Sequence, residues 1–565
     1  MPTVSYLKIS FAVAAVFAAG AAHSADLSAV PFANPKVTGM AAPTILSPEL
    51  AQIVLAQGAM KLENASSTFA FYGYNGDGPM VPAPGAVQAN GNNVEATKTE
   101  PDKNVYLVLA GQHGADAHYD YGKRFLYQPH ESGVKNSSTG QKMGFLSRIN
   151  LDADGAHRVT LLASQDVQGN ALPTFDGITW NPFAQRLLLT AELGSKGGVW
   201  QSTADLPALV VDVSGALGRG GYEGIQNDAD GNIWIVEDVG GVAGTVNKHA
   251  KQANSFVYRF VPKNKADLTQ GGKLQALQVM SLAHPGQPIV FHAGQADGDI
   301  LSQDMHDLHT YGKVFNTLWV TIHDTDVDGS VPFNANALAK TQLATPFKRP
   351  ENGQFRPGTK FGEFYFDETG DTDLLSEAGS AYGGFGAVQK LTQTSPSANT
   401  GKLALFYLGD AAHSGFDNVA FWSKDEIVFV EDAGDKLHSR RNAFDSGYLF
   451  NVRLNYADVA NQPLRWLAQG RDPSATIDSD LSASSNNGFQ NDGDNEITGI
   501  HIADGDPTAR GLLGAKLPHP FHDGWRVFYT QQHGDNITYE IIRAKKPEVE
   551  GDRDRDDARD SDDQE

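Results

Sequence analysis

One short phrase recurs at distant places in this chain: an acidic residue beside a small one, a turn, and a β-patterned run that ends in further acids. The three clear copies occupy residues 175–192, 222–238 and 416–432. A phrase that returns with similar internal spacing marks one supersecondary unit used several times in a closed or stacked architecture. We therefore expect the leading acids of the copies to lie close together.

Weaker copies accompany the clear ones, and together they predict about six units. They lie around residues 307–324, 350–369 and 496–530. The 59 glycines and 27 prolines, placed between β-branched and aromatic runs, favour many short strands. Radial repetition of such strands leaves few exposed sheet edges. The sequence thus predicts an all-β fold, a β-propeller of about six blades with irregular insertions. A pair of β-sandwich domains is the alternative.

The beginning of the chain is typical of an export signal. Lys8 precedes an apolar run over residues 9–19, and small residues follow before Ala25. This run is short for a membrane span. We expect a periplasmic or secreted protein that does not contact the membrane after signal cleavage, and we expect it to be a monomer. An N-terminal membrane anchor is the alternative.

Four regions are expected along the chain. Ser47 and Pro48 are typical of a helix start, which predicts a short helix over residues 48–56. The end of the chain is rich in Asp and Arg and poor in apolar residues, which predicts a disordered, solvated tail. The predicted regions are a signal peptide at 1–24, an N-terminal extension at 25–68, a propeller at 69–544 and an acidic tail at 545–565.

Charge and cysteine content exclude several classes of function. The formal net charge of −23 argues against binding to a nucleic-acid backbone, which needs a basic face. The chain has no cysteine, so it has neither disulfides nor thiolate metal ligands. No nucleophile elbow and no phosphate-binding glycine loop occurs, which disfavours a serine hydrolase.

The leading acids are the candidate metal ligands. On a propeller, equivalent positions of successive units face one axis, so these carboxylates would crowd together and repel. A divalent cation with oxygen ligands, calcium above all, would relieve that repulsion. Acids at strand starts can also be plain turn formers, and the trailing acids Glu192, Glu237, Asp238, Glu431 and Asp432 can cap strands or complete a metal shell. The leading acids are Asp176, Glu223, Glu351, Asp417 and Glu496.

Two central segments resemble the PhoX-type alkaline phosphatases. Residues 348–355 with 363–369 resemble the family phrase RPEDG … FYFTT, and residues 416–434 are similar to its PDNLAFD … ED-x-G phrase. Fainter likenesses lie at 74–77 and 128–131. The resemblance implies an exported calcium propeller that hydrolyses phosphate esters, with iron as well in some members.

The resemblance also implies particular site residues. Glu351 and Glu431 would be metal ligands, Asp417 and Asn418 would lie beside them, and Glu131 is a weaker transfer. The chain departs from the family pattern at Asn352, where the family has Asp, and in lacking the cysteine that serves the iron site. Calcium is therefore the expected cofactor, and iron is not.

The leading functional hypothesis is a metal-dependent phosphoesterase acting on a small-molecule phosphate ester. Metal ions would carry most of the charge stabilisation. Arg349 is the candidate catalytic residue because a guanidinium can hold a phosphate oxygen with two hydrogen bonds, although it can equally form a salt bridge to a neighbouring acid. The alternatives are a calcium-dependent lactonase or esterase and a non-catalytic calcium-binding scaffold.

Overall fold

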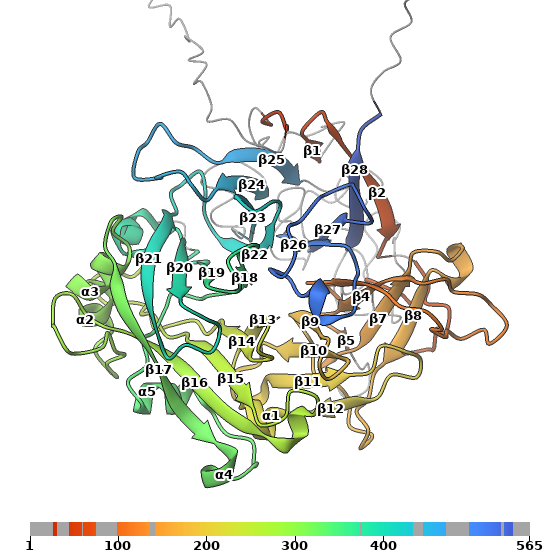
Figure 1. Ribbon diagram of the computed structural model, residues 1–565, viewed down its shortest axis with the longest axis horizontal. Coiled ribbons are helices and arrows are strands. Elements are labelled where there is room, and N and C mark those ends of the chain that lie inside the picture. The colour runs from red at the N-terminus through yellow and green to blue at the C-terminus, as the bar shows by residue number, and fades with distance from the viewer. Residues whose placement is uncertain are drawn as a thin grey trace, which may run out of the picture.

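The computed structural model describes residues 26–30, 44–58, 60–74, 99–135, 142–372, 376–432, 445–469, 496–532 and 536–545. Within these residues, six four-stranded units surround one axis (Figure 1). Each innermost strand contacts the innermost strand of the next unit in a closed ring. In order around the axis these strands are β3 (Val105–Val108), β9 (Ile178–Asn181), β13 (Tyr222–Asn227), β18 (Gly353–Phe355), β22 (Phe416–Phe421) and β26 (Glu496–Ala503). The predicted all-β propeller is confirmed.

The remaining strands of each blade follow outward from the innermost one, and all pairs are antiparallel. The first three blades continue with β4 (Arg124–Pro129), β7 (Leu146–Asn150) and β8 (Val159–Ala163); β10 (Arg186–Ala191), β11 (Gly198–Ser202) and β12 (Val210–Asp212); and β14 (Ile233–Glu237), β15 (Val257–Pro262) and β16 (Gly272–Val279). The last three continue with β19 (Glu363–Glu368), β20 (Ala387–Gln393) and β21 (Thr400–Leu408); β23 (Glu426–Glu431), β24 (Asp445–Asn451) and β25 (Leu464–Gln469); and β27 (Arg526–Gln532) and β28 (Ile537–Arg543). A separate hairpin pairs β5 (Val134–Lys135) with β6 (Lys142–Met143).

The third and fourth blades are joined at their outer edges. The long strand β17 (Phe315–Asp324) pairs with β16 on one side and with β21 on the other, which makes one nine-stranded sheet. Shared outer edges of this kind fix two neighbouring blades relative to one another.

Two strands from the N-terminal part of the chain complete the fifth and sixth blades. Strand β1 (Ile45–Leu46) pairs with β25, and β2 (Leu50–Ala56) pairs with β28, so the expected extension at 25–68 contributes to two sheets. The helix predicted over residues 48–56 is wrong. Leu50 packs into the apolar cluster of the fifth and sixth blades, and residues 50–56 pair with β28, with a bulge between Val54 and Ala56. Pairing with a distant partner strand overrode the local capping signal.

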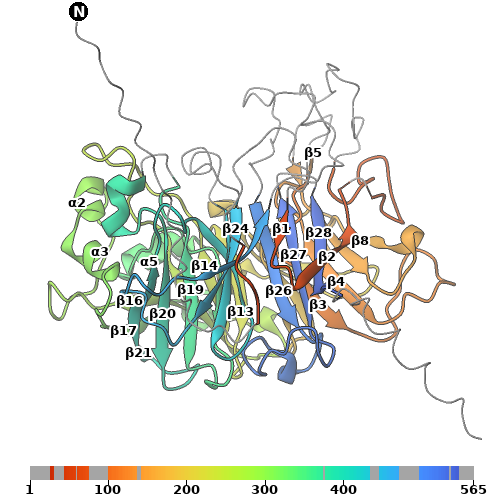
Figure 2. The same ribbon diagram turned by 90° about the horizontal axis from the view of Figure 1, so that it is seen from above.

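Large apolar side chains fill the spaces between blades. Trp234 on β14 is 1% exposed and lies edge-on to Trp319 and Phe355, with ring centroids 5.1 and 5.0 Å apart. The short helices are α1 (Ser214–Leu217), α2 (Ala296–Ile300), α3 (Gln303–Leu308), α4 (Thr325–Asp328) and α5 (Ala335–Thr341). Figure 2 shows α2 and α3 at the outer rim, away from the axis. Among the described residues, none of the helices has the length and apolar character needed to cross a bilayer.

The expected signal peptide at 1–24 lies outside the described residues, as does the acidic tail apart from Lys545.

Candidate metal centre

An acidic residue stands at or just before the start of every innermost strand. Each of these side chains is buried, with at most 8% of its surface exposed. We call this set the acidic hub: Asp102, Asp176, Glu223, Glu351, Asp417 and Glu496. Five of its members are leading acids of the repeated phrase, so the structure brings them to equivalent positions of successive blades.

The small residue in the phrase has a steric cause. A Cβ atom on Gly224 would lie 2.6 Å from the carbonyl oxygen of Glu351, and the Gly224 amide donates to that same oxygen over 2.7 Å. A Cβ atom on Gly177 would likewise collide with the carbonyl oxygen of Glu223. The backbone of one blade therefore passes so close to the next that a side chain does not fit. The glycines let neighbouring acids approach one another.

Two groups of carboxylates come close enough to share an ion. Asp102, Glu131 and Asp176 each place a carboxylate oxygen within 4.8 Å of the others. Glu223, Glu351 and Asp417 do the same. Glu131 follows β4, and its carboxylate also accepts a hydrogen bond from Gln532 at 3.0 Å.

Asp102 was not identified in the sequence. It stands just before the innermost strand of the first blade, but Lys103 follows it where the second and third blades have Gly177 and Gly224. The remaining signal was weak: an acid shortly before the buried run of β3. Its neighbour Lys103 is itself buried, with 3% of its surface exposed.

A second ring of acids lies next to the hub. In four blades, a residue just after the second strand donates a backbone hydrogen bond toward the hub. The acceptor is the backbone carbonyl oxygen of the residue two positions before the hub acid, at 2.7 to 2.9 Å. Three of these residues are acids, Glu131, Asp238 and Asp432, and the fourth is Thr369. Glu192 follows the second strand of the second blade, and its pKa is raised by burial and by the charges of Asp238 and Glu131.

Strand alternation separates the trailing acids into two kinds. Asp238 and Asp432 face the hub, whereas the preceding Glu237 and Glu431 are held within their blades. Glu237 accepts hydrogen bonds from Tyr258 and Asn336, at 2.9 and 3.0 Å. The two carboxylate oxygens of Glu431 accept backbone amides of Ser414 and Ser446, each at 2.9 Å.

Asn418, the other residue implied by the resemblance, adjoins the hub. Its Nδ2 donates to Asp417 Oδ1 at 2.8 Å and to Thr498 Oγ1 at 3.0 Å. Glu496 lies near enough to Asp432 and Asp417 for their charges to act on it. His309 contacts Glu368 rather than a hub acid, with its Nε2 3.4 Å from Glu368 Oε2.

Burial and mutual repulsion raise the pKa values of the hub acids. Burial, followed by the Asp417 charge, raises the pKa of Asp102 to about 7. Burial and the Asp432 charge raise the pKa of Asp417 to about 6. The pKa values of the four other hub acids are raised well above their usual range, with burial as the largest cause. Ionisation of the hub acids is therefore unfavourable when no cation is bound, because their carboxylates repel one another.

The donor set of the hub fits a hard cation. Asp176 Oδ1 and Asp417 Oδ2 are buried and have no hydrogen-bond donor among the described residues. Carboxylate oxygens of this kind are the ligands of calcium and magnesium. Because the chain has no cysteine, a thiolate-bound iron does not fit these residues.

Arg349 lies at the edge of the hub and is engaged by two acids. Its guanidinium makes a forked contact with Asp238, with Nε to Oδ1 at 3.0 Å and Nη2 to Oδ2 at 2.7 Å, and Nη2 also donates to Glu351 at 3.1 Å. Nη1 donates to Thr372 Oγ1 at 3.2 Å. The backbone of Arg349 has φ of 58°, which is left-handed and unfavourable for a residue with a side chain.

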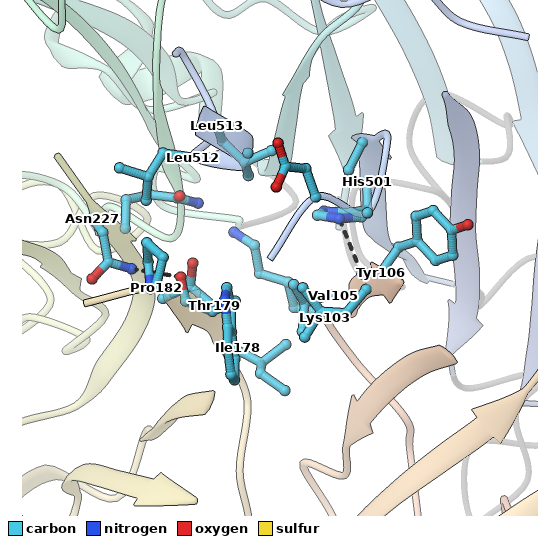
Figure 3. A pocket seen from close by; sticks show the side chains of 17 residues that line it. Lys103, Val105, Tyr106, Ile178, Thr179, Pro182, Asn227, His501, Leu512 and Leu513 are labelled. Carbon is cyan, nitrogen blue, oxygen red and sulfur yellow. Dashed lines mark hydrogen bonds between the residues drawn. The ribbon is translucent and has the colours of Figure 1, made fainter. Parts of the chain in front are cut away.

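A small cavity of about 30 Å³ borders Lys103 and lies among the innermost strands (Figure 3). Its lining includes Lys103, Ile178, Asn227 and His501. His501 accepts the Tyr106 amide at 3.2 Å, and burial above all lowers its pKa to about 3. The cavity has room for one or two water molecules.

Comparisons with known proteins show what this chain is similar to. The alkaline phosphatase PhoX family matches residues 242–507. No curated protein matches the chain in sequence. Among solved structures, Pseudomonas fluorescens PhoX in complex with vanadate, a transition state analogue, has a TM-score of 0.52 and 11% identity, covering 92% of this chain and 98% of the other. The gluconolactonase XC5397 from Xanthomonas campestris has a TM-score of 0.37 and 11% identity, covering 92% and 97%.

The family match extends from the third blade to the start of the sixth, and it includes Glu351 and Asp417 of the hub. It covers both segments on which the sequence resemblance rests. That resemblance is confirmed: residues 242–507 match the alkaline phosphatase PhoX family.

Proposed function

We propose that the chain is an exported, calcium-dependent phosphoesterase that hydrolyses phosphate esters at the acidic hub. The single observation that carries this proposal is the convergence of the hub acids, two groups of which lie within 4.8 Å. A phosphatase of the PhoX type acts on phosphate esters, and a strongly acidic site attracts such an anion only when cations reverse its charge.

The hub residues would hold calcium through carboxylate oxygens. Glu223, Glu351 and Asp417 would form one site, and Asp102, Glu131 and Asp176 would form the other. When bound, calcium would supply positive charge for the phosphoryl oxygens and would polarise a water molecule. The hub acids are at most 8% exposed, and this burial strengthens electrostatic interactions at the site.

Arg349 would orient the substrate. Its side chain is 21% exposed, whereas that of Asp238 is 5% exposed, so the guanidinium is the more accessible member of the pair. Asp238 fixes the plane of the guanidinium through the forked contact. Nη1, which contacts the Thr372 hydroxyl, is the group we assign to a phosphoryl oxygen of the substrate.

Export and assembly complete the proposal. The lysine at position 8 and the apolar run after it support a signal peptide, and therefore a periplasmic or secreted protein. We propose a monomer because the ring of blades closes within one chain. Sedimentation of the purified protein and the N-terminal sequence of the exported form test these two points.

The central experiment combines elemental analysis with activity. The full chain is purified without chelator, its calcium and iron are counted, and hydrolysis of an aryl phosphate is measured before and after chelation. We expect bound calcium, no iron, and activity that chelation abolishes and calcium restores. Inhibition by vanadate, the ligand in the P. fluorescens PhoX structure, is a further expected result.

Each opposing outcome has a distinct meaning. Hydrolysis that persists after all metal is removed would overturn the metal dependence. Turnover of a generic lactone without turnover of the aryl phosphate would indicate a lactonase. Tight calcium binding without turnover of either compound would indicate a binding scaffold.

A further inference from the structure

Lys103 is a buried cation in contact with the acidic hub. Lys103 directly follows Asp102, shortly before the start of β3, and 3% of its surface is exposed. Figure 3 shows its side chain extending away from Val105 and Tyr106, with the amino end toward the middle of the view. Full burial of a lysine is rare unless opposite charges or hydrogen-bond acceptors surround its ammonium group.

A chain of contacts connects this ammonium, on the first blade, to the third and fourth blades. Lys103 Nζ donates to the side-chain oxygen of Asn352, beside β18. The Asn352 side-chain nitrogen donates to Glu223 Oε1 at 3.1 Å. The Asn352 backbone amide donates to Asp367 Oδ1 at 2.7 Å. The amide side chain therefore faces a cation on one side and a carboxylate on the other.

Four carboxylates act electrostatically on the ammonium: Glu223, Asp367, Asp417 and Asp102. Asp417 Oδ2 and Asp367 Oδ2 have no hydrogen-bond donor in the described parts of the chain. The ammonium thus compensates carboxylates of both hub groups and that of Asp367.

The position of Lys103 within the repeat is unusual. The second and third blades have Gly177 and Gly224 after the hub acid, and the fourth and fifth have Asn352 and Asn418. The first blade has a lysine there instead. A fixed positive charge lowers the affinity of a neighbouring site for a divalent cation, and it offsets carboxylate repulsion when that cation is absent.

We propose that Lys103 is a tethered cation of the hub. It positions Asn352 and Glu223, keeps the metal-free hub folded, and holds the calcium affinity of the Glu223–Glu351–Asp417 group below the value that the carboxylates alone would give. This inference rests on the proposed function, because it concerns the metal site assigned there. It makes Lys103 a positioning residue that regulates metal exchange.

The test uses Lys103→Met, which keeps the length of the side chain and removes its charge. Calcium binding to the full chain is measured by calorimetry, and thermal unfolding is followed with chelator and with calcium. We expect Lys103→Met to bind calcium about tenfold more tightly or better, and to melt below the parent protein only when metal is absent. Lys103→Arg retains the charge and is expected to behave like the parent.

Two comparisons separate this role from a merely structural one. Lys273, which is exposed and paired with Asp324 at 3.1 Å, provides the control variant Lys273→Met, with unchanged calcium affinity expected. A Lys103→Met protein with equal or weaker calcium affinity overturns the inference. A parent protein that binds no divalent cation overturns the proposed metal centre instead.

A second variant applies if Lys103→Met does not fold. Lys103→Gln removes the positive charge and keeps a side-chain nitrogen that can donate to the Asn352 oxygen. Tighter calcium binding than in the parent protein supports the inference. Unchanged or weaker binding overturns it.

Discussion

Arg349 and Asp238 form a forked ion pair between the third and fourth blades, with Arg349 Nη2 2.7 Å from Asp238 Oδ2. The same guanidinium nitrogen contacts Glu351 of the acidic hub at 3.1 Å. The orientation of this arginine is therefore set by one acid from each of two blades. The predictions below test the hub, this arginine and the closure of the ring.

Arg349→Lys retains the positive charge but removes the planar fork. We expect kcat/KM for an aryl phosphate to fall about ten- to a hundredfold, because a charged hydrogen bond contributes about 1.5–3 kcal/mol. Vanadate inhibition should weaken in parallel. Steady-state kinetics with Arg356→Lys as the control measures the effect; Arg356 follows the far end of β18 and pairs with Glu363 and Asp425. Equal kinetics in Arg349→Lys and the parent would remove Arg349 from the substrate site.

Glu351→Gln removes one ligand charge from the hub with little change in volume. We expect weaker calcium binding, a smaller rise in melting temperature on adding calcium, and a lower phosphatase rate. Each tenfold loss of affinity reduces the stabilisation by saturating calcium by about 1.4 kcal/mol. Glu363→Gln on the adjacent strand β19 is the control, since Glu363 pairs with Arg356 at 3.0 Å. Identical melting curves of Glu351→Gln and the parent, with and without chelator, would contradict the prediction.

Asp102→Asn tests the hub acid that the sequence did not reveal. Because Asp102 belongs to a carboxylate group with Glu131 and Asp176, its loss should reduce the calcium content per chain. Elemental analysis after gel filtration measures this directly. Asp523→Asn, at an 81% exposed side chain, is the matched control. A calcium content unaffected by Asp102→Asn would assign metal binding to the Glu223 group alone.

The metal-free protein should lose stability as pH rises. Burial above all raises the pKa of Asp102 to about 7 and that of Asp417 to about 6, whereas an unfolded chain has values near 4. Between these values the folded protein holds more protons than the unfolded one, so its stability is highest at the acidic end and declines with increasing pH. Melting temperatures in chelator from about pH 5 to about pH 8 check this.

Excess calcium should reverse that trend, since the cation takes the place of the protons. Burial also raises the pKa of Glu237 to about 7, and this acid lies outside the hub. Glu237→Gln should therefore leave the calcium-dependent difference between the curves unchanged. A metal-free melting temperature that stays flat or rises over this range would contradict the prediction.

Leu50→Ala tests ring closure by β2. Leu50 is 5% exposed in the cluster shared by the fifth and sixth blades, so its truncation should cost about 2–5 kcal/mol of unfolding free energy. Val54→Ala on the same strand, where the side chain is 47% exposed, should cost far less. Chemical denaturation of both variants makes the comparison. Equal losses would indicate that β2 does not pack as the structure has it.

The sequence predicted the hub acids best where steric crowding requires a glycine beside them. Gly177 and Gly224 have no room for a side chain because the next blade passes against them, and these glycines made the phrase recognisable. Asp102 has no such glycine, because Lys103 follows it. The sequence resemblance implied Glu431 as a ligand, and that role stays a prediction. Both oxygens of Glu431 accept backbone amides, whereas the charge of the next residue, Asp432, acts on Asp417 of the hub. The phrase alone does not tell which of two neighbouring acids makes these contacts.

Closure of the ring was beyond sequence reasoning for another reason. Residues 50–56 pair with a strand almost the whole length of the chain away, and local signals at Ser47 and Pro48 indicated a helix instead. Long-range pairing leaves little local trace when the strand is short and half exposed.

The pairing of β2 with β28 also constrains when the protein can become native. Strand β28 lies at residues 537–543, so a chain under synthesis has made β2 long before its partner exists. The sixth blade, and with it the position of Glu496, forms only after β28 has been made. Convergence of all six hub acids is therefore a late event in folding.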